Sequence, residues 1–203
     1  MFRRLRVTLS TEFDTDIDTD IDIAEPKRSE TVLERSGTQT THQPGAPAAP
    51  AAAIGPDDLR AAINELVPFQ KFVGARLAEL GADGAVATLP DAPHLLNHVG
   101  TGHAAALFLV AEAAAGGALA GALGERVTTV RFVLRASEIR YLRAARGQLR
   151  AVADVSGEDV RARCSRLAAG ERFEEVVSSL LYDPAGDHVA TAQFTYHCRI
   201  LPG

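Results

Sequence analysis

The segment from Ala104 to Leu123 is the feature that most constrains how this chain folds. Apart from Glu112, it contains only Ala, Gly, Leu, Phe and Val. A run this apolar predicts a helix that other elements surround. Because Ala and Gly insert weakly into lipid and Glu112 interrupts the run, a buried helix is favoured over a membrane span. A charged side chain is costly to bury unless it is paired, solvated or used, so Glu112 is a candidate functional residue.

Composition limits the classes of protein to consider. The chain has 203 residues, of which 46% are hydrophobic and 5% aromatic, which fits one medium-sized domain with an appendage. The net charge is -5 and the basic residues alternate with acids, so nucleic acid is not an expected partner. Cys164 and Cys198 lie far apart without metal-ligand spacing. They indicate reduced thiols in a cytoplasmic protein, and no metal or cofactor is implied.

The first part of the chain differs from the rest in composition. Residues 14–23 alternate Asp with Thr or Ile, and residues 44–53 are almost all Pro and Ala. We therefore expect residues 1–55 to form a disordered acidic arm and residues 56–203 to form the folded domain. The aspartates lack the turn glycine and terminal glutamate of a calcium loop. Acids also follow the basic start of the chain, so no export signal is predicted.

Hydrophobic periodicity predicts an α+β domain. A helix is expected to begin at Pro56 and end near Pro68, and the long apolar helix to follow a loop over residues 90–102. Residues 158–167 fit either a short helix or an irregular segment. The remaining segments alternate as strands do, and the first two of them form a hairpin; they span residues 73–80, 85–89, 127–142, 148–155, 173–182 and 189–201.

Two motifs in the domain resemble a known family. Asn97 is followed six residues later by His103, and Glu112 comes nine residues after His103. The segment Glu138–Ala145 reads Glu-Ile-Arg-Tyr-Leu-Arg-Ala-Ala. This spacing is similar to the Asn, His-Gly-Gly and acidic motif of the PaaI-type acyl-CoA thioesterases. The second segment resembles their strand ending Tyr-Leu-Arg-Pro-Ala, and the resemblance covers about residues 69–201.

The resemblance implies a hotdog fold, in which an antiparallel sheet wraps around a long central helix. It also implies hydrolysis of acyl-CoA thioesters by a homodimer or homotetramer. Glu112 would act as general base or nucleophile, and the backbone N–H of Ala104 would polarise the carbonyl. Asn97 would orient water or the carboxylate, whereas His103 is expected to shape the turn before the helix.

The geometry of an α-helix predicts that two subunits would share each active site. Ala104 and Glu112 are eight residues apart on the predicted helix. At about 1.5 Å per residue they are separated by roughly 12 Å along the axis, too far to serve one carbonyl. The resemblance agrees, because hotdog thioesterases commonly pair sheets edge to edge and pack their helices antiparallel. One subunit would then supply the amide and the other the acid.

Further residues follow from the same resemblance. The chain departs from the family at Ala104 and Ala105, where glycines are usual, and these methyl groups would narrow the thioester slot. Leu134 stands where relatives often carry a hydroxyl; Thr128, Thr129 and Ser137 are the alternatives. Gly102 and a group of arginines are the candidate substrate-binding residues. The arginines, which would hold the phosphates of the coenzyme, are Arg140, Arg143 and Arg146.

Other interpretations stay open at this stage. Glu112 would have a structural role if it paired with Arg135 or another cation at a subunit seam. Without the resemblance, the arginines would be a solvated strand face, and Asn97 would be a turn residue. A hotdog protein that binds acyl groups without hydrolysing them would tolerate Ala104 and Ala105. A dehydratase is the third alternative, although that reaction usually employs a catalytic histidine facing an acid.

Overall fold

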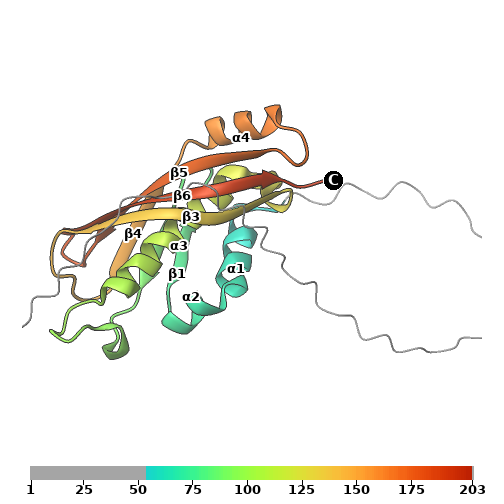
Figure 1. The fold of residues 1–203 in the computed structure, drawn as a ribbon. Helices are drawn as coiled ribbons and strands as arrows, with labels where there is room; N and C mark the ends of the chain where they lie inside the picture. The colour runs from blue at the N-terminus through green and yellow to red at the C-terminus, as the bar shows by residue number, and fades with distance from the viewer. Residues whose placement is uncertain (1–53, 203) are drawn as a thin grey trace, which may run out of the picture. The chain divides into compact units, whose positions relative to one another are not determined.

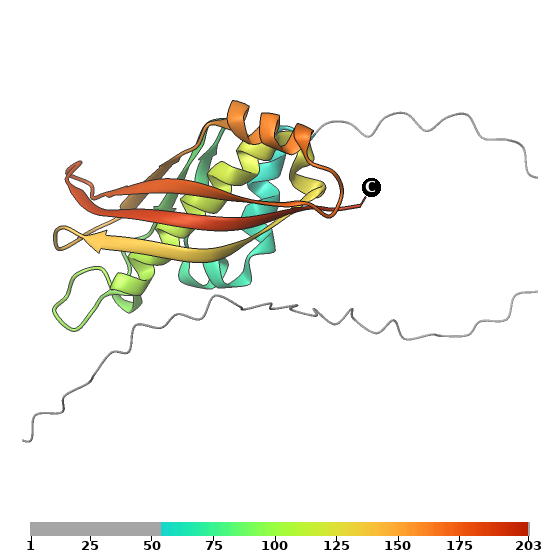
Figure 2. The same ribbon diagram turned by 45° about the horizontal axis from the view of Figure 1, so that its top comes forward.

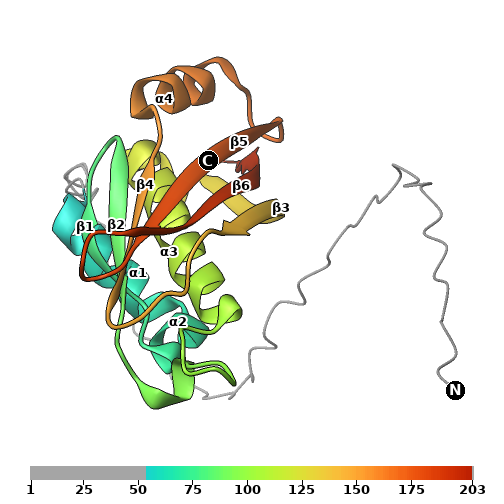
Figure 3. The same ribbon diagram turned by 90° about the vertical axis from the view of Figure 1, so that its left-hand side faces the viewer.

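The computed structural model describes residues 54–202, which form an antiparallel sheet wrapped around one long helix, α3 (Ala104–Leu123) (Figure 1, Figure 3). The strands are β1 (Arg76–Leu80), β2 (Gly84–Leu89), β3 (Val130–Tyr141), β4 (Leu149–Asp154), β5 (Arg172–Tyr182) and β6 (His188–Ile200). Their order across the sheet is β1-β2-β4-β5-β6-β3, and neighbouring strands are antiparallel. The predicted α+β class is confirmed. The predicted acidic arm lies almost wholly outside the described residues.

The remaining helices cover the parts of α3 that the sheet leaves open. α1 (Pro56–Leu66) packs beside β1 and α3, and α2 (Pro68–Val73) packs against α3. α4 (Gly157–Arg166) lies at the carboxyl-terminal end of α3, where Arg161 donates to the carbonyl of Ala122 at 3.1 Å. Two short 3-10 turns, Pro93–Leu95 and Gly124–Thr128, flank α3. Together these elements bury α3, leaving only part of its surface exposed.

Element boundaries differ from the prediction by more than one residue at three points. The first helix ends at Leu66, and Pro68 opens the separate helix α2, so the first strand begins at Arg76 instead of residue 73. Proline suits a first helical position but drives the residue before it into extended backbone, and Val67 has φ -104° and ψ 96°. The 3-10 turn after α3 delays β3 to Val130.

The undecided segment, residues 158–167, is helical. It forms most of α4, whose first turn is capped by Ser156 accepting from the N–H of Asp159 at 3.3 Å. Val160 and Cys164 are the side chains that α4 buries, four residues apart on one helix face. Most of the charges that left the prediction open are exposed, whereas Arg163 is half-buried and pairs with Glu175 at 2.8 Å.

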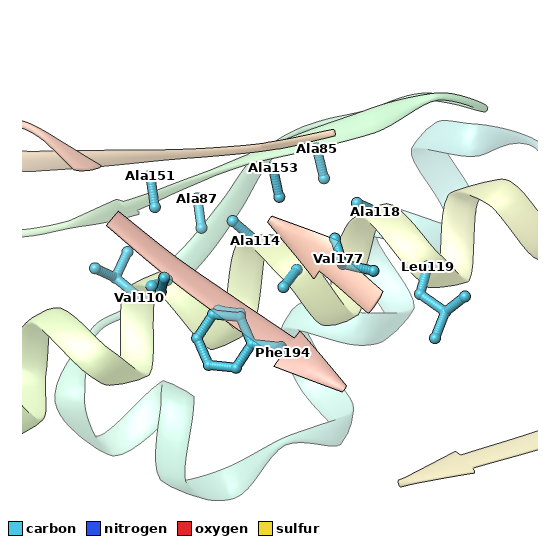
Figure 4. Packing of buried hydrophobic residues seen from close by; sticks show 14 of the residues in the cluster. Ala85, Ala87, Val110, Ala114, Ala118, Leu119, Ala151, Ala153, Val177 and Phe194 are labelled. Atoms are coloured by element: carbon cyan, nitrogen blue, oxygen red, sulfur yellow. The ribbon is translucent and has the colours of Figure 1, made fainter. Parts of the chain in front are cut away.

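Small side chains allow the sheet to approach α3 closely. Alanines on the inner faces of β2 and β4 point at alanines of α3, as Figure 4 shows for Ala87, Ala153 and Ala114. At Gly121 a Cβ would lie 2.1 Å from the carbonyl oxygen of Gly81, so only glycine fits. Of the most apolar window of this helix, 78% is buried. The prediction of a buried core helix is therefore confirmed.

The two edges of the sheet are different. β1 has five residues and is packed beside α1, whereas β3 has twelve residues and pairs only with β6. In Figure 2 the free side of β3 runs along the outside of the sheet. A bulge between Leu134 and Ala136 changes which side chains face inward. The edge at β3 thus offers a long row of unpaired backbone groups.

Candidate active site

The start of α3 is held by His103. This residue has extended backbone and caps the helix, its Nδ1 accepting from the N–H of Ala105 at 3.1 Å. Because Nδ1 accepts, the proton of the neutral ring is on Nε2. Ala104 is the first helical residue and is exposed, and its N–H has no hydrogen-bond partner among residues 54–202. The helix start therefore presents a free donor where the dipole favours negative charge.

Asn97 closes the loop that precedes this helix start. Its Oδ1 accepts from the N–H groups of Val99 and Thr101, both at 3.0 Å, and its Nδ2 donates to Thr101 Oγ1 at 2.8 Å. Gly102 donates to the carbonyl of Ala145 at 2.8 Å. The side chain of Asn97 is thus committed to the loop, which brings it close to Gly102 and His103 but not to Glu112 of the same protomer.

Gly102 is closely packed between the first turn of α3 and the segment after β3. A Cβ at this position would lie 2.8 Å from Leu107 Cδ1 and 3.5 Å from the Cβ of Ala145. The absence of a side chain therefore lets the loop lie against the first turn of α3 and the segment after β3. Gly102 shapes the donor end of the site through its backbone.

The three candidate arginines do not form one cluster. Arg140 faces outward from β3, opposite Thr191, beside a shallow depression of about 270 Å³ on the side of the sheet away from α3. Each arginine has a different partner: Arg140 pairs with Glu138 at 2.8 Å, Arg143 pairs with Asp187 at 2.9 Å, and Arg146 donates to the carbonyl of Gly100 at 3.1 Å. Only Arg146 is brought to the loop at the start of α3.

Tyr141 is a residue of this region to which the sequence assigned no role. It is the last residue of β3, and its hydroxyl donates to the carbonyl of Ala104 at 3.0 Å. Burial raises the pKa of Tyr141, which keeps the hydroxyl protonated as a donor. The contact joins the end of the edge strand to the first turn of α3. The family-like segment around Tyr141 was the only sequence signal that could have drawn attention to it.

Glu112 lies in the middle of α3 and is half-buried. Gln70 Nε2 donates to its Oε2 at 3.4 Å, and the hydroxyl of Tyr196 donates to its backbone carbonyl at 3.4 Å. Burial raises the pKa of Glu112, and the contacts with Gln70 and Tyr196 offset part of that rise. A carboxylate with a raised pKa is a better proton acceptor, as general-base chemistry near neutral pH requires.

The structural alternative for Glu112 is not realised within one protomer. Arg135, its suggested partner, pairs with Glu174. Over residues 54–202, no cation lies within ion-pair distance of Glu112. The nearby Gln70 could not have been identified from the sequence, because an isolated glutamine between two phenylalanines carries no motif. Glu112 is thus a half-buried carboxylate without a cationic partner.

Glu112 belongs to the one stripe of α3 that other elements cover least. Ala105 is exposed, and Leu109, Glu112 and Gly116 are only half-buried, whereas most of the helix is buried. Their spacing of four, three and four residues places them on one face. The acid therefore faces the side on which a further element can approach.

The structure also locates Leu134, which stands where relatives often carry a hydroxyl group, and the residues that are alternatives to it. Leu134 is half-buried and opposite Tyr196 on the inner side of β3. Thr129 Oγ1 donates to the carbonyl of Arg126 at 3.1 Å. Ser137 is exposed and opposite the inward-facing Phe194, because the bulge returns it to the inner side. Of the alternatives to Leu134, Ser137 is thus the one on the inner side of β3.

Comparisons with known proteins identify the family and the fold. The sequence matches the domain family of unknown function DUF4442 over residues 55–198, and the comparison with curated proteins finds no match. Among solved structures, the chain is similar to PA5026 of Pseudomonas aeruginosa, a probable thioesterase, with 23% identity, a TM-score of 0.61 and coverage of 73% of this chain and 97% of that one.

Two further structures carry names of the predicted family. A thioesterase family protein of Silicibacter pomeroyi is 18% identical, with a TM-score of 0.57, and the match covers 72% of this chain and 99% of that one. The PaaI protein of the phenylacetic acid degradation operon of E. coli is 20% identical, with a TM-score of 0.52, and the match covers 69% of this chain and 89% of that one. The chain therefore belongs to the DUF4442 family and has the hotdog fold that its sequence predicts.

Proposed function

We propose that this protein hydrolyses acyl-CoA thioesters, with Glu112 as general base or nucleophile and the N–H of Ala104 as the donor to the carbonyl oxygen. The observation that carries the proposal is the state of Glu112, a half-buried carboxylate with a raised pKa and without a cation, on the least covered stripe of α3. The similarity in fold to a thioesterase family protein and to PaaI supports the same activity.

As general base, Glu112 takes a proton from a water molecule while the water oxygen bonds to the thioester carbon. The carbonyl oxygen becomes an oxyanion, which accepts a hydrogen bond from the N–H of Ala104. The carbon–sulfur bond then breaks, and the coenzyme A thiolate leaves and takes up a proton. As nucleophile, Glu112 would instead form an anhydride with the acyl group, which water then hydrolyses. The two routes use the same pair of groups.

The proposal requires two copies of the chain. Ala104 and Glu112 lie on one continuous helix, eight residues apart, which is about 12 Å along the axis. Edge-to-edge pairing of two β3 strands would satisfy the free edge and place two α3 helices side by side in opposite directions. The start of one α3 would then approach Glu112 of the other. The functional unit in this proposal is a homodimer, alone or as half of a homotetramer.

The other predicted residues have supporting roles in the proposal. Asn97, Gly102 and His103 hold the loop and the helix start that carry the donor. Among the arginines, Arg146 is the first candidate for the coenzyme phosphates because it lies at this loop, and Arg143 is the second. Arg140 would contact only a phosphate over the outer face of the sheet.

The cellular location is inferred from the thiols and the substrate. Cys164 and Cys198 are both free and buried. Reduced thiols are typical of the cytoplasm, where acyl-CoA is also found. We therefore place the protein in the cytoplasm.

Substitution Glu112→Gln tests the proposal. It keeps the size of the side chain and removes the base, so kcat on acyl-CoA substrates should fall by about 10²- to 10⁴-fold with little change in KM. Free thiol release measures hydrolysis, and size-exclusion chromatography checks that the dimer persists. Equal hydrolysis by the variant and the parent would reject the mechanism.

The second candidate function is acyl-CoA binding without hydrolysis. It is favoured by the methyl groups of Ala104 and Ala105, which stand where the resembled family has glycines. A panel of acyl-CoA substrates separates the two functions. Thermal-shift binding by the parent protein with no thiol release from any substrate would support this second function over the first.

A further inference from the structure

Gln70 is buried although its neighbours on the same short helix are not. Its side chain is 8% exposed, whereas Phe69 and Phe72 are 63% and 82% exposed. Glutamine is normally a surface residue and phenylalanine a buried one, so α2 reverses the usual preference. The reversal turns an amide towards Glu112 of α3, with Nε2 and Oε2 3.4 Å apart. Departures from a local rule of this kind are expected at functional sites.

We propose that Gln70 is the positioning residue of Glu112: its amide holds one carboxylate oxygen and stabilises the ionised form. This inference rests on the proposed function of Glu112 as base or nucleophile. Gln70 does not contact the reacting atoms in this assignment. It acts through the acid.

The backbone of Gln70 is well placed for this role. Its carbonyl accepts from the N–H of Gly74 at 2.9 Å and from the N–H of Ala75 at 3.0 Å. Gly74 ends α2 in the left-handed region with φ 85°. α2 starts at Pro68, whose ring fixes the first turn. A short helix fixed at both ends gives the side chain of Gln70 a defined origin opposite Glu112.

A neutral donor suits a carboxylate that must accept a proton. A cation such as arginine beside Glu112 would lower its pKa strongly and weaken it as a base. An amide compensates part of the lost hydration without adding charge. Asn97, the amide of the family-like motif, is committed to Thr101 and Val99 and lies at the other end of the site. The side-chain amide that contacts Glu112 therefore comes from Gln70.

Two other titratable residues lie near Glu112 or Gln70, namely Tyr196 and Lys71. From β6, the titratable group facing it is Tyr196, whose pKa is raised mainly by burial, so its hydroxyl stays protonated. Lys71, the charged neighbour of Gln70 on α2, pairs with Glu65 at the surface. A change in the titration of Glu112 on substitution of Gln70 would therefore report the contact between these two residues.

Variants of the full chain test the inference in two independent ways. Gln70→Leu removes the donor at similar size, and Gln70→Glu adds a second carboxylate of the same shape. Lys71→Ala is the matched control on the same helix. NMR titration of ¹³C-labelled glutamate carboxyls follows Glu112 in each protein, assigned by comparison with Glu112→Gln. This readout does not depend on any activity.

The expected result is a rise in the pKa of Glu112 by about one unit in Gln70→Leu, as for loss of a hydrogen bond to a charged group. In Gln70→Glu the coupled pair should titrate with one apparent pKa higher still. Lys71→Ala should leave the titration of Glu112 unchanged. With acyl-CoA as substrate, the acidic limb of kcat/KM should move by the same amount as the pKa, with KM nearly constant.

An unmoved titration of Glu112 in both Gln70 variants would overturn the inference. If the titration moves but the parent protein hydrolyses no acyl-CoA, the positioning contact stands and the proposed hydrolase fails. If the leucine variant does not fold, the NMR titration of Glu112 in the isosteric Gln70→Glu protein is the test. A loss of thermal stability with no shift in pKa or pH profile would show that Gln70 has only a packing role.

Discussion

The beginning and the middle of α3 are built in opposite ways. At the beginning, Ala104 is exposed, and the groups around it, His103, Asn97 and Tyr141, contact backbone atoms. In the middle, Glu112 is half-buried and is contacted by side chains from two other elements. The acid is therefore positioned within one protomer, whereas the amide is held open at the surface.

This difference is consistent with the proposed site, whose two halves do not complete each other within one chain. The exposed N–H of Ala104 can act in catalysis only when a ligand accepts its hydrogen bond. The half-buried carboxylate of Glu112 can act only when a reacting group reaches it. Because both lie on one rigid helix, no side-chain rotation brings them together. The experiments below separate the donor end from the acid end.

At the donor end of the proposed site, the largest effect is expected from removing the donor itself. Ala104→Pro deletes one N–H at a first helical position, where proline is well tolerated, and His103 before it already has φ -68° and ψ 135°. We expect kcat to fall by about 10²- to 10³-fold, as for loss of an oxyanion donor, with a melting temperature close to that of the parent. Steady-state kinetics and thermal unfolding measure the two quantities.

Mixing this variant with Glu112→Gln tests whether subunits share the site. After random exchange, half of the dimers are mixed and each has one intact site, so about a quarter of the parent activity should return. Activity no greater than that of either variant alone would show that the amide and the acid do not come from different protomers.

A smaller effect is expected from the loop at the donor end. Asn97→Ala removes three hydrogen bonds that close residues 97–101 and should lower the free energy of unfolding by about 2–3 kcal/mol. Hydrolysis should weaken because the donor is less well placed, while the titration of Glu112 stays unchanged. Chemical denaturation measures stability. The exposed neighbour His98 is the control, and His98→Ala should change stability by less than about 0.5 kcal/mol.

Glu112 should make the free energy of unfolding depend on pH. Burial raises the pKa of Glu112 in the folded state, so the folded protein binds the proton more tightly than the unfolded chain. This contribution to stability is fully present below the unfolded pKa and is lost as pH rises through the folded pKa. Glu112→Gln should therefore be more stable than the parent at neutral pH, and the gap should close on acidification. Denaturation curves at several pH values check this; a gap that widens towards acid would contradict the raised pKa.

The smallest effect is expected at Tyr141. Replacement by Phe removes one hydrogen bond to the carbonyl of Ala104 and should cost about 0.5–1.5 kcal/mol. Because the carbonyl stays accessible to water, activity should fall only a few-fold. Thermal unfolding and kcat/KM measure the effect, and a loss as large as that of Ala104→Pro would mean that Tyr141 itself contacts the substrate.

The fold was largely predictable because its signals are local. Alternation marks the strands, and the apolar run from Ala104 marks the central helix. The prediction was wrong between Pro68 and Arg76, where a proline opened a second helix in a stretch given no element, and the expected strand began three residues too early. That short helix packs against α3, and contacts of this kind, which stabilise most short helices, are not contained in a one-dimensional pattern.

The site was predictable only in part. The spacing of Asn97, His103 and Glu112 drew attention to α3 and the loop before it, and the resemblance supplied the roles that we propose for them. Arg140 was grouped with Arg143 and Arg146 because they are close in sequence, yet strand alternation and the chain reversal after β3 separate them. Gln70 was missed because its partner is 42 residues away.

The sequence by itself determined the order of the elements, the buried helix and the acid within it, because periodicity and polarity act over a few neighbouring residues. Only the tertiary structure decided what surrounds that acid: an amide from α2, a tyrosine from β6 and no cation among the described residues. The pKa of a carboxylate depends on its burial and on contacts through space. Those contacts come from residues far away along the chain, so no local pattern encodes them.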